Sequence, residues 1–412
     1  MIKYLRVTSL LMLFLNIGIE VVHAQSKEID STRVRRFDIF PAISFSPETS
    51  LTLGALGSMY PNLKGEDPET RQSNINFLVI YTLANQLLVQ SNWDLFTDGN
   101  KMRFLGEVGV AKFPNRNYGP GNNAAARVVE YELSGSQVVD STIVNYKRYS
   151  VSSLFFKPSV LWEVRDHLYA GGIADLDYVW NFEELADSTI TTDGKTGIDL
   201  LERTTLGWRA GLGASLIWDT RDNILSSMSG SYINLNTIFY GKHLGSEYDY
   251  YTILLDARTF LNTVGRHTLA LRGVGNFGGT NDETIPLRGL PRIGGSKLGR
   301  GYFNGTFQDS NVISFQAEYR IPLWKENNLG SIYHFWKRLA MTAFASGAQA
   351  FGQEESFHTS NFNFGVGGGM RYLFNAQSRA YLRIDYAFGL TPNAGGIDEF
   401  QSGLYFSFGE AF

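Results

Sequence analysis

The chain has 412 residues and a formal net charge of −4. Charged residues make up only 18% of it, whereas aromatic residues make up 14% and glycine occurs 43 times. This composition disfavours both a disordered chain and a helical bundle, because aromatic residues and glycine favour strands and turns. A hydrophobic fraction of 43% is too low for a polytopic helical membrane protein, and the charge shows no basic excess of the kind that binds nucleic acid.

The N-terminal residues predict an exported protein. Lys3 and Arg6 form a positively charged start, and residues 9–22 are mostly apolar. Val22-His23-Ala24 has the small-x-small pattern of a cleavage site, so we expect residues 1–24 to be a signal peptide cleaved after Ala24. A retained helical anchor is the alternative. Residues 25–36 would then be a short N-terminal periplasmic segment.

The rest of the chain, 37–412, alternates apolar and polar residues with a period of two. Between 312 and 321, Ile313, Phe315, Ala317, Tyr319 and Ile321 share one face, and Ser314, Gln316, Glu318 and Arg320 share the other. A soluble sandwich would carry Lys and Glu on its polar face, whereas this face repeatedly carries Gly, Ser, Asn, Arg and Asp. Aromatic residues also gather near strand ends. The pattern predicts an all-β fold, a transmembrane antiparallel β-barrel in the bacterial outer membrane, surrounded by lipid.

About sixteen strands are expected. Their predicted ranges are 37–46, 50–59, 73–83, 86–96, 102–113, 146–163, 167–181, 205–219, 230–240, 248–261, 266–277, 310–323, 338–351, 360–373, 379–390 and 400–410. The two longest connections, 113–145 and 278–309, are predicted to be loops. The second is rich in glycine and contains Pro286 and Pro291, which interrupt a strand.

The last predicted strand carries a second export-related pattern. Gln401, Gly403, Phe406 and Phe408 place a polar residue, a glycine and two alternate aromatic residues at the end of the chain. This resembles the C-terminal signal by which outer-membrane barrels are recognised by their assembly machine.

Six separated motifs occur along the chain in a fixed order. They are Tyr118-Gly119-Pro120-Gly121-Asn122, Trp218-Asp219-Thr220-Arg221-Asp222-Asn223, Leu298-Gly299-Arg300-Gly301-Tyr302 preceded by Gly294-Gly295, Glu318-Tyr319-Arg320-Ile321-Pro322-Leu323, the stretch Gly365–Tyr372, and Leu382-Arg383-Ile384-Asp385-Tyr386. Together they resemble the bacterial surface antigen barrel of the BamA/TamA superfamily, which includes two-partner secretion transporters. The resemblance covers essentially all of the chain after the signal peptide and is densest from 205 to 412.

The resemblance implies a sixteen-stranded barrel whose long sixth extracellular loop folds into the lumen, with Arg300, Gly301 and Tyr302 at its tip. An arginine in a low-dielectric lumen needs acidic partners. The period of two places Glu318 and Asp385 on the lumen-facing side, together with Arg320, Arg371 and Arg383. The alternative is an ordinary solvated loop arginine.

The glycines Gly365, Gly367 and Gly369 share the lumen-facing side, where a loop backbone would need to approach closely. They could equally be ordinary strand glycines. One position departs from the family, which usually has a Phe-x-Asp motif whose Asp pairs with the loop arginine. Here the motif is Phe344-Ala345-Ser346, so the contact would rest on Glu318 or Asp385, or be weaker.

A larger departure lies at the N-terminus. Members of the family carry periplasmic POTRA domains that receive clients, and residues 25–36 are too few to form one. The sequence is therefore expected to be a barrel-only member. Its partners would be periplasmic or lipoprotein chains, a second copy of itself, or unfolded polypeptide clients.

The family's mechanism depends on a weak lateral seam between the first and last strands, which opens to template a client strand. Pro41 removes one hydrogen-bond donor from 37–46, and Gly403 and Gly409 loosen 400–410. Pro41 could instead simply mark where the strand begins.

No enzyme is expected. The sequence has no cysteine, which excludes disulfides, thiolate metal sites, cysteine nucleophiles and a lipoprotein anchor. It has no HExxH, Gly-x-Ser-x-Gly or P-loop motif, and no metal or cofactor is expected. Two functions remain open. One is assembly or translocation of polypeptides, and the other is a passive barrel that serves as a pore, an adhesin or a structural partner without insertase activity.

Overall fold

A computed structural model describes residues 37–46, 50–61, 63, 70–83, 85–118, 121–122, 128–134, 137–144, 147–184, 190–191, 205–280, 285–323, 336–352, 355–375, 379–392, 394 and 400–412. The predicted signal peptide 1–24 and the segment 25–36 lie outside these ranges. Residues from Ile39 to Phe412 form one compact unit.

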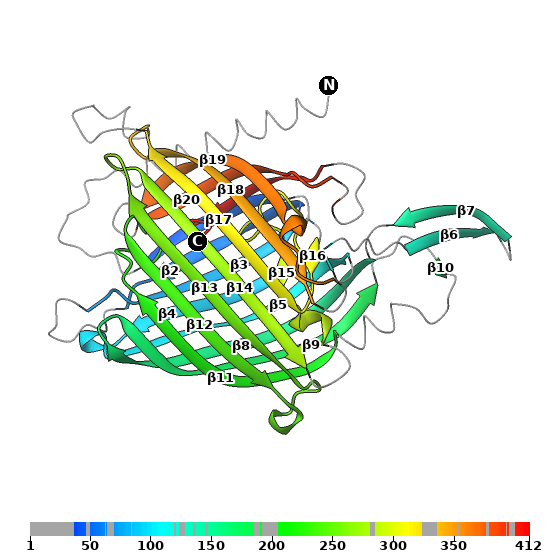
Figure 1. The fold of residues 1–412 in the computed structure, drawn as a ribbon, viewed down its shortest axis with the longest axis horizontal. Coiled ribbons are helices and arrows are strands. Elements are labelled where there is room, and N and C mark those ends of the chain that lie inside the picture. The colour runs from blue at the N-terminus through cyan, green and yellow to red at the C-terminus, as the bar shows by residue number, and fades with distance from the viewer. Residues whose placement is uncertain are drawn as a thin grey trace. The chain divides into compact units, whose positions relative to one another are not determined.

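Sixteen strands follow one another in chain order in a single sheet (Figure 1). They are β1 (Phe37–Ser46), β2 (Ser50–Met59), β3 (Asn74–Thr82), β4 (Leu87–Phe96), β5 (Met102–Asn117), β8 (Lys147–Arg165), β9 (Leu168–Glu184), β11 (Gly207–Asp219), β12 (Gly230–Tyr240), β13 (Tyr250–Asn262), β14 (Thr268–Thr280), β17 (Asn311–Pro322), β18 (Leu339–Phe351), β19 (Asn363–Asn375), β20 (Ala380–Gly389) and β21 (Ser402–Phe408). The predicted all-β barrel of about sixteen strands is confirmed, and its strand ranges agree to within a few residues.

Successive side chains of a strand point to opposite faces of this sheet, as the period of two predicts. On β20, Ile384 and Tyr386 are 45% and 46% exposed, whereas Asp385 between them is fully buried. On β17, Phe315 is 56% exposed and Glu318 is fully buried. The outer face is therefore apolar, as contact with lipid requires, and the inner face carries the charges.

Two predicted loops contain more regular structure than expected. β5 extends to Asn117, and β6 (Val128–Ser134), β7 (Gln137–Val144) and β10 (Ile190–Thr191) form a separate three-stranded sheet. The prediction that 113–145 is only a loop was therefore wrong. The valines on either side of Gly135-Ser136 form a hairpin pattern that could have indicated these strands.

The prediction for 278–309 was wrong in the same way. β14 continues through two glycines to Thr280, because β13 offers a pairing partner as far as Tyr250. Within the segment, β15 (Arg292–Ile293) pairs with β16 (Phe307–Gln308). The connection between β14 and β17, residues 281–310, is called loop 6 below.

Within the described ranges there are four single-turn 3₁₀ helices: η1 (Asp98–Asn100), η2 (Lys242–Leu244), η3 (Leu287–Gly289) and η4 (Thr359–Asn361). In the part of the chain that the structure describes, no helix is long and apolar enough to span a membrane.

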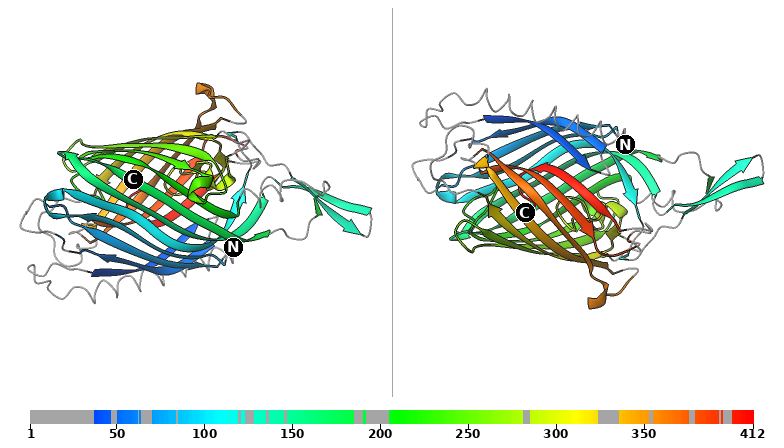
Figure 2. Two further views of the ribbon diagram at one scale, coloured as in Figure 1. Left: turned by 90° about the horizontal axis from the view of Figure 1, so that it is seen from below. Right: turned by 90° about the horizontal axis from the view of Figure 1, so that it is seen from above.

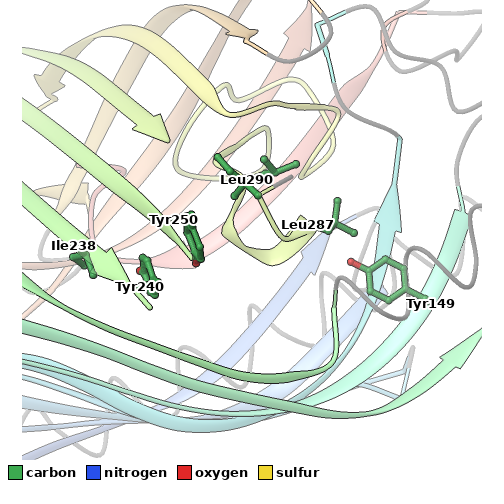
Figure 3. Close-up of a cluster of buried hydrophobic side chains, with 7 residues drawn as sticks. Tyr149, Ile238, Tyr240, Tyr250, Leu287 and Leu290 are labelled. Atoms are coloured by element: carbon green, nitrogen blue, oxygen red, sulfur yellow. The ribbon is translucent and has the colours of Figure 1, made fainter. Parts of the chain in front are cut away.

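Loop 6 lies inside the curved sheet, where its yellow-green trace is seen between the walls (Figure 2). Its first part packs against the inner wall: Leu287 and Leu290 belong to one buried cluster with Tyr149, Tyr240 and Tyr250 (Figure 3). Tyr240 and Tyr250 stack with ring centroids 4.2 Å apart. The lumen therefore has a packed core, and the predicted inward fold of the sixth loop is confirmed.

Candidate functional site

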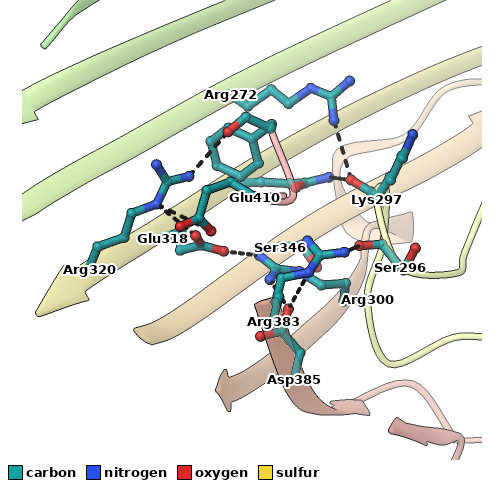
Figure 4. Close-up of polar contacts among 12 residues, drawn as sticks. Arg272, Ser296, Lys297, Arg300, Glu318, Arg320, Ser346, Arg383, Asp385 and Glu410 are labelled. Atoms are coloured by element: carbon teal, nitrogen blue, oxygen red, sulfur yellow. Dashed lines mark hydrogen bonds and ion pairs between the residues drawn. The ribbon is translucent and has the colours of Figure 1, made fainter. Parts of the chain in front are cut away.

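Loop 6 brings Arg300 to the inner wall of the barrel. The Arg300 side chain is 2% exposed; its Nη1 donates to Asp385 Oδ2 on β20 and its Nη2 to Glu318 Oε2 on β17, both at 2.7 Å (Figure 4). The Arg300 guanidinium carbon lies 3.4 Å from the centre of the Phe344 ring on β18. These contacts of Arg300 with Glu318 and Asp385 are called the loop-6 lock below. One loop residue thus ties together three strands.

Three further arginines surround the two acids. Arg320 Nε donates to Glu318 Oε1 at 2.9 Å, and Arg371 Nη1 donates to Asp385 Oδ1 at 2.5 Å. Arg383 lies next to Asp385, with 3.6 Å between Nε and Oδ2. Each carboxylate oxygen therefore faces at least one guanidinium. This is the arrangement that buried charges need in order to offset their loss of water.

A third acid completes the cluster from beyond the last strand. Glu410 Oε2 accepts a hydrogen bond from Arg371 Nε at 2.8 Å and lies 3.9 Å from Arg320 Nε. Sequence analysis missed Glu410, because it follows a turn at Gly409 (φ +80°) and so falls outside the alternation of β21. Gly409 was predicted to loosen the last strand, but it lies after the end of β21.

The two residues after Arg300 fit closely against β19 and β20. Gly301 has a φ of +107°, and a Cβ there would collide with the backbone of Phe388. Tyr302 is 1% exposed, and its hydroxyl donates to the Phe364 carbonyl at 2.5 Å. A Cβ at Gly389 would meet the Tyr302 ring, so glycine on β20 makes room for the tip of loop 6.

Of the three glycines predicted to face the lumen on β19, Gly365, Gly367 and Gly369, only Gly365 directly faces the loop backbone. A Cβ on Gly365 would collide with the Arg300 carbonyl oxygen. A Cβ on Gly367 would instead meet Phe344, and one on Gly369 would meet Asp385. Of these three glycines, Gly365 is therefore the one that allows the loop tip to approach closely.

Ser346, at the position of the family's usual Asp, makes no contact with Arg300 that the structure records. Its Oγ donates weakly to the Gly365 carbonyl at 3.5 Å. Phe344 of the same motif does contact Arg300, with its ring face rather than with a charge. Sequence analysis used Phe344 only as a landmark, and the period of two, which puts it on the inner face, was the signal that could have found it.

The last strand holds the loop tip as well. Tyr405 Oη accepts from Gly301 N–H and donates to the Tyr302 carbonyl, each at 3.2 Å. Gln401 Oε1 accepts from Phe303 N–H at 2.7 Å. Gln401 was assigned above only to the C-terminal assembly signal, and Tyr405 was not singled out although it shares the inner face.

Gly403 and Phe406, also predicted on the last strand, form no recorded hydrogen bond or ion pair with the lock. Gly403 lies on β21 beneath the Tyr405 ring, and Phe406 is half-buried on the same strand. Phe408 is the last residue of β21. Pro41 lies within β1, which stands at the opposite end of the strand order from β21.

The cluster is a nearly charge-balanced anchor, with four arginines and three acids. It contains no nucleophile beside a base, and in the described ranges no group of three His, Cys, Asp or Glu residues could hold a metal ion. What the geometry can do is hold or release a loop across the lumen.

Comparisons with known proteins agree with this architecture. Residues 69–412 match the Omp85 superfamily domain. BamA from Haemophilus ducreyi lacking POTRA domains 1-3 is similar with a TM-score of 0.53 and 11% identity over 93% of this chain and 74% of that chain. CdiB from Acinetobacter baumannii gives a TM-score of 0.52 and 11% identity over 90% of this chain, which spans only 60% of the CdiB chain. A search of curated proteins gave no significant match. At this identity the two structures show a shared fold, and the family match over most of the chain shows that it belongs to the Omp85 superfamily, as an outer-membrane barrel of the BamA/TamA type.

Proposed function

We propose that this barrel inserts or translocates polypeptides across the outer membrane through a lateral seam between β1 and β21. Membership of the Omp85 superfamily and the fold shared with BamA and CdiB support the proposal. The partners would be membrane lipid, unfolded clients and periplasmic or lipoprotein chains, with self-association as a further possibility. The chemistry would be binding and release, not catalysis.

The observation that carries the proposal is the position of the tip of loop 6. The tip rests on Tyr405 of β21 and on Gln401 just before that strand, and the ion cluster around Arg300 includes Glu410 just beyond it. β21 is one end of the strand order. A movement of the seam strand would therefore change the contacts that keep the lumen filled.

Edge pairing supplies the driving force of the proposed step. When β1 and β21 separate, each exposes a row of unpaired backbone N–H and C=O groups, and in lipid every such group needs a partner. A client strand can meet this need by pairing with the free edge. Pro41 lowers the number of donors on β1, which favours a weak seam.

A locked seam tests the proposal. The chain has no cysteine, so a pair introduced into β1 and β21 can form only one disulfide within the chain. A matched control is Tyr386→Cys with Leu404→Cys, neighbours on β20 and β21 whose side chains face outward. We expect the seam disulfide to abolish function and the control to spare it. Undiminished function with the seam oxidised would overturn the proposal.

Depletion of the protein followed by quantitative outer-membrane proteomics identifies the client class. Loss of many unrelated barrels would indicate general assembly, and loss of one or two proteins would indicate a dedicated transporter. An unchanged proteome would reject the assembly function and leave a pore or structural barrel.

A further inference from the structure

The connection between β11 and β12, residues 220–229, reaches far beyond the two strands it joins. β11 and β12 are the eighth and ninth strands of the sheet. Yet the connection contacts Arg320 on β17, the twelfth strand, and Arg379 in the turn between the fourteenth and fifteenth strands, β19 and β20. We call residues 220–229 the strap.

Two long-range contacts hold the strap at its far side. Arg320 Nη1 donates to the Ser227 carbonyl at 3.2 Å, and Asp222 forms an ion pair with Arg379. Ser226 and Ser227 are 6% and 3% exposed, so the middle of the strap is covered by protein. A connection lying free in solvent would be exposed along its length.

The strap is also organised within itself. Asp222 Oδ1 accepts hydrogen bonds from the backbone N–H groups of Met228 at 2.9 Å and Ser229 at 3.1 Å. Asn223 Oδ1 accepts from Leu225 N–H at 2.9 Å and from Ser226 N–H at 2.8 Å. These side-chain bonds fix the loop before it meets the opposite wall, so little entropy remains to be lost on contact.

The root of the strap is anchored to the wall. Asp219, the last residue of β11, is fully buried and accepts from both Arg103 at 3.1 Å and Arg221 at 2.9 Å. Ile224 packs against the buried cluster that contains Phe96. The strap therefore has a rigid root and a weaker outer contact, which is the arrangement of a hinged element.

Residues 409–412 cross the same end of the barrel from the opposite side. They leave β21, yet Phe412 packs with Phe260 of β13 and Ala270 of β14. Arg320 Nη2 donates to the Phe412 carbonyl at 3.1 Å. Arg320 thus contacts the strap, residues 409–412 and Glu318 of the loop-6 lock. Figure 4 shows the contact between Arg320 and Glu318.

We propose that the strap closes the periplasmic end of the lumen and is released when the Asp222–Arg379 ion pair opens. It follows the end of β11 opposite to the side where loop 6 enters, so the two segments fill the barrel from its two ends. At rest the barrel is then closed rather than an open pore. This inference concerns the barrel alone and does not depend on a lateral seam.

Access to a thiol inside the lumen tests the strap. Asn234 is half-buried near the strap end of β12, and Asn234→Cys supplies the only thiol in the chain. Purified barrel is treated with a maleimide carried on a polyethylene glycol, and the labelling rate is measured. Arg379→Gln and Asp222→Asn should each raise the rate about two- to five-fold, as expected for a partly exposed ion pair. Arg379→Glu, which places a second negative charge next to Asp222, should raise the labelling rate further.

Asp249→Asn is the matched control. Asp249 also accepts a backbone hydrogen bond, from Lys242 N–H, and forms a partly exposed ion pair with Lys242, but in the connection at the other end of the barrel. The Asp249→Asn variant should leave the labelling rate unchanged. High salt should raise the labelling rate of the parent protein but not that of Asp222→Asn, because salt screens the ion pair. Equal rates for all variants, or an equal rise with Asp249→Asn, would overturn the proposal. Heat-modifiability on gels establishes that each variant is folded.

Discussion

Replacing Arg300 by alanine removes the centre of the loop-6 lock. The substitution deletes two charge-assisted hydrogen bonds of 2.7 Å, to Glu318 and Asp385. Each is worth about 1.5–3 kcal/mol in net terms. It also removes the contact between the guanidinium and the Phe344 ring, which at a desolvated site contributes about 2 kcal/mol.

The net loss is smaller than the sum, because neither acid is left alone. Glu318 keeps Arg320 at 2.9 Å, and Asp385 keeps Arg371 at 2.5 Å. Breaking a buried pair costs about 3–5 kcal/mol, and the remaining arginines favour the lower end. We therefore expect Arg300→Ala to favour release of loop 6 by about 3 kcal/mol, roughly a hundredfold in its opening equilibrium.

The assay is labelling of a cysteine placed at Ser296 in loop 6, together with the heat-modifiability transition of the barrel. Arg258→Ala is the matched control, because Arg258 is an arginine of the inner wall that pairs with Asp256 and forms no recorded hydrogen bond or ion pair with the described part of loop 6. Arg300→Ala should raise the labelling rate roughly a hundredfold and lower the transition temperature. Arg300→Lys, which keeps the charge but not the two-pronged geometry, should fall between the two. Parent-level protection in Arg300→Ala, or equal exposure in Arg258→Ala, would refute the reasoning.

Three further predictions concern the tip of loop 6 and the strap. Gly365→Ala should displace the loop tip and raise labelling, whereas Gly245→Ala, where nothing lies within 4 Å of an added Cβ, should cost only about 1 kcal/mol of backbone strain. Gln401→Ala should weaken the tip by about 1–3 kcal/mol, measured by the same labelling, because it removes an acceptor from a loop backbone N–H group. Partial burial opposes ionisation of Asp222, but the ion pair with Arg379 and two backbone N–H groups outweigh it and hold the pKa of Asp222 below its usual value of 3.8. The stability that this pair contributes is therefore present above about pH 4 and is lost as the pH falls further. Labelling inside the lumen with an acid-tolerant pyridyl disulfide should stay flat down to about pH 4 and then rise, and an equal rise in Asp222→Asn would contradict this.

The alternation of the strands could be predicted because it is a local property. Each strand residue faces either lipid or lumen, so hydrophobicity with a period of two follows directly from the fold. This is why the sequence alone places Glu318 and Asp385 on the inner face. The hairpin β6–β7 was missed because its sequence stands inside a long connection that the barrel pattern does not require.

The candidate site was only partly predictable, because its residues come from loop 6, from the four strands β17 to β20 and from the end of the chain. The resemblance supplied Arg300, and periodicity supplied its two acidic partners. Neither could place Glu410, which follows a left-handed turn at Gly409, nor show that Gln401 receives a hydrogen bond from loop 6. Such contacts depend on where a loop of about thirty residues comes to rest.

The amino-acid sequence by itself determined an all-β outer-membrane barrel, the order of its sixteen strands and which side chains face the lumen. These are consequences of short-range patterning in a chain that must satisfy every backbone group in lipid. Only the tertiary structure decided that Arg300 is shared by two acids, and that residues 220–229 cross from β11 and β12 to Arg320 and Arg379. The reason is physical: the lumen brings together side chains that are as far apart in the chain as Asp222 and Arg379, separated by 157 residues, and no local pattern encodes which of them meet.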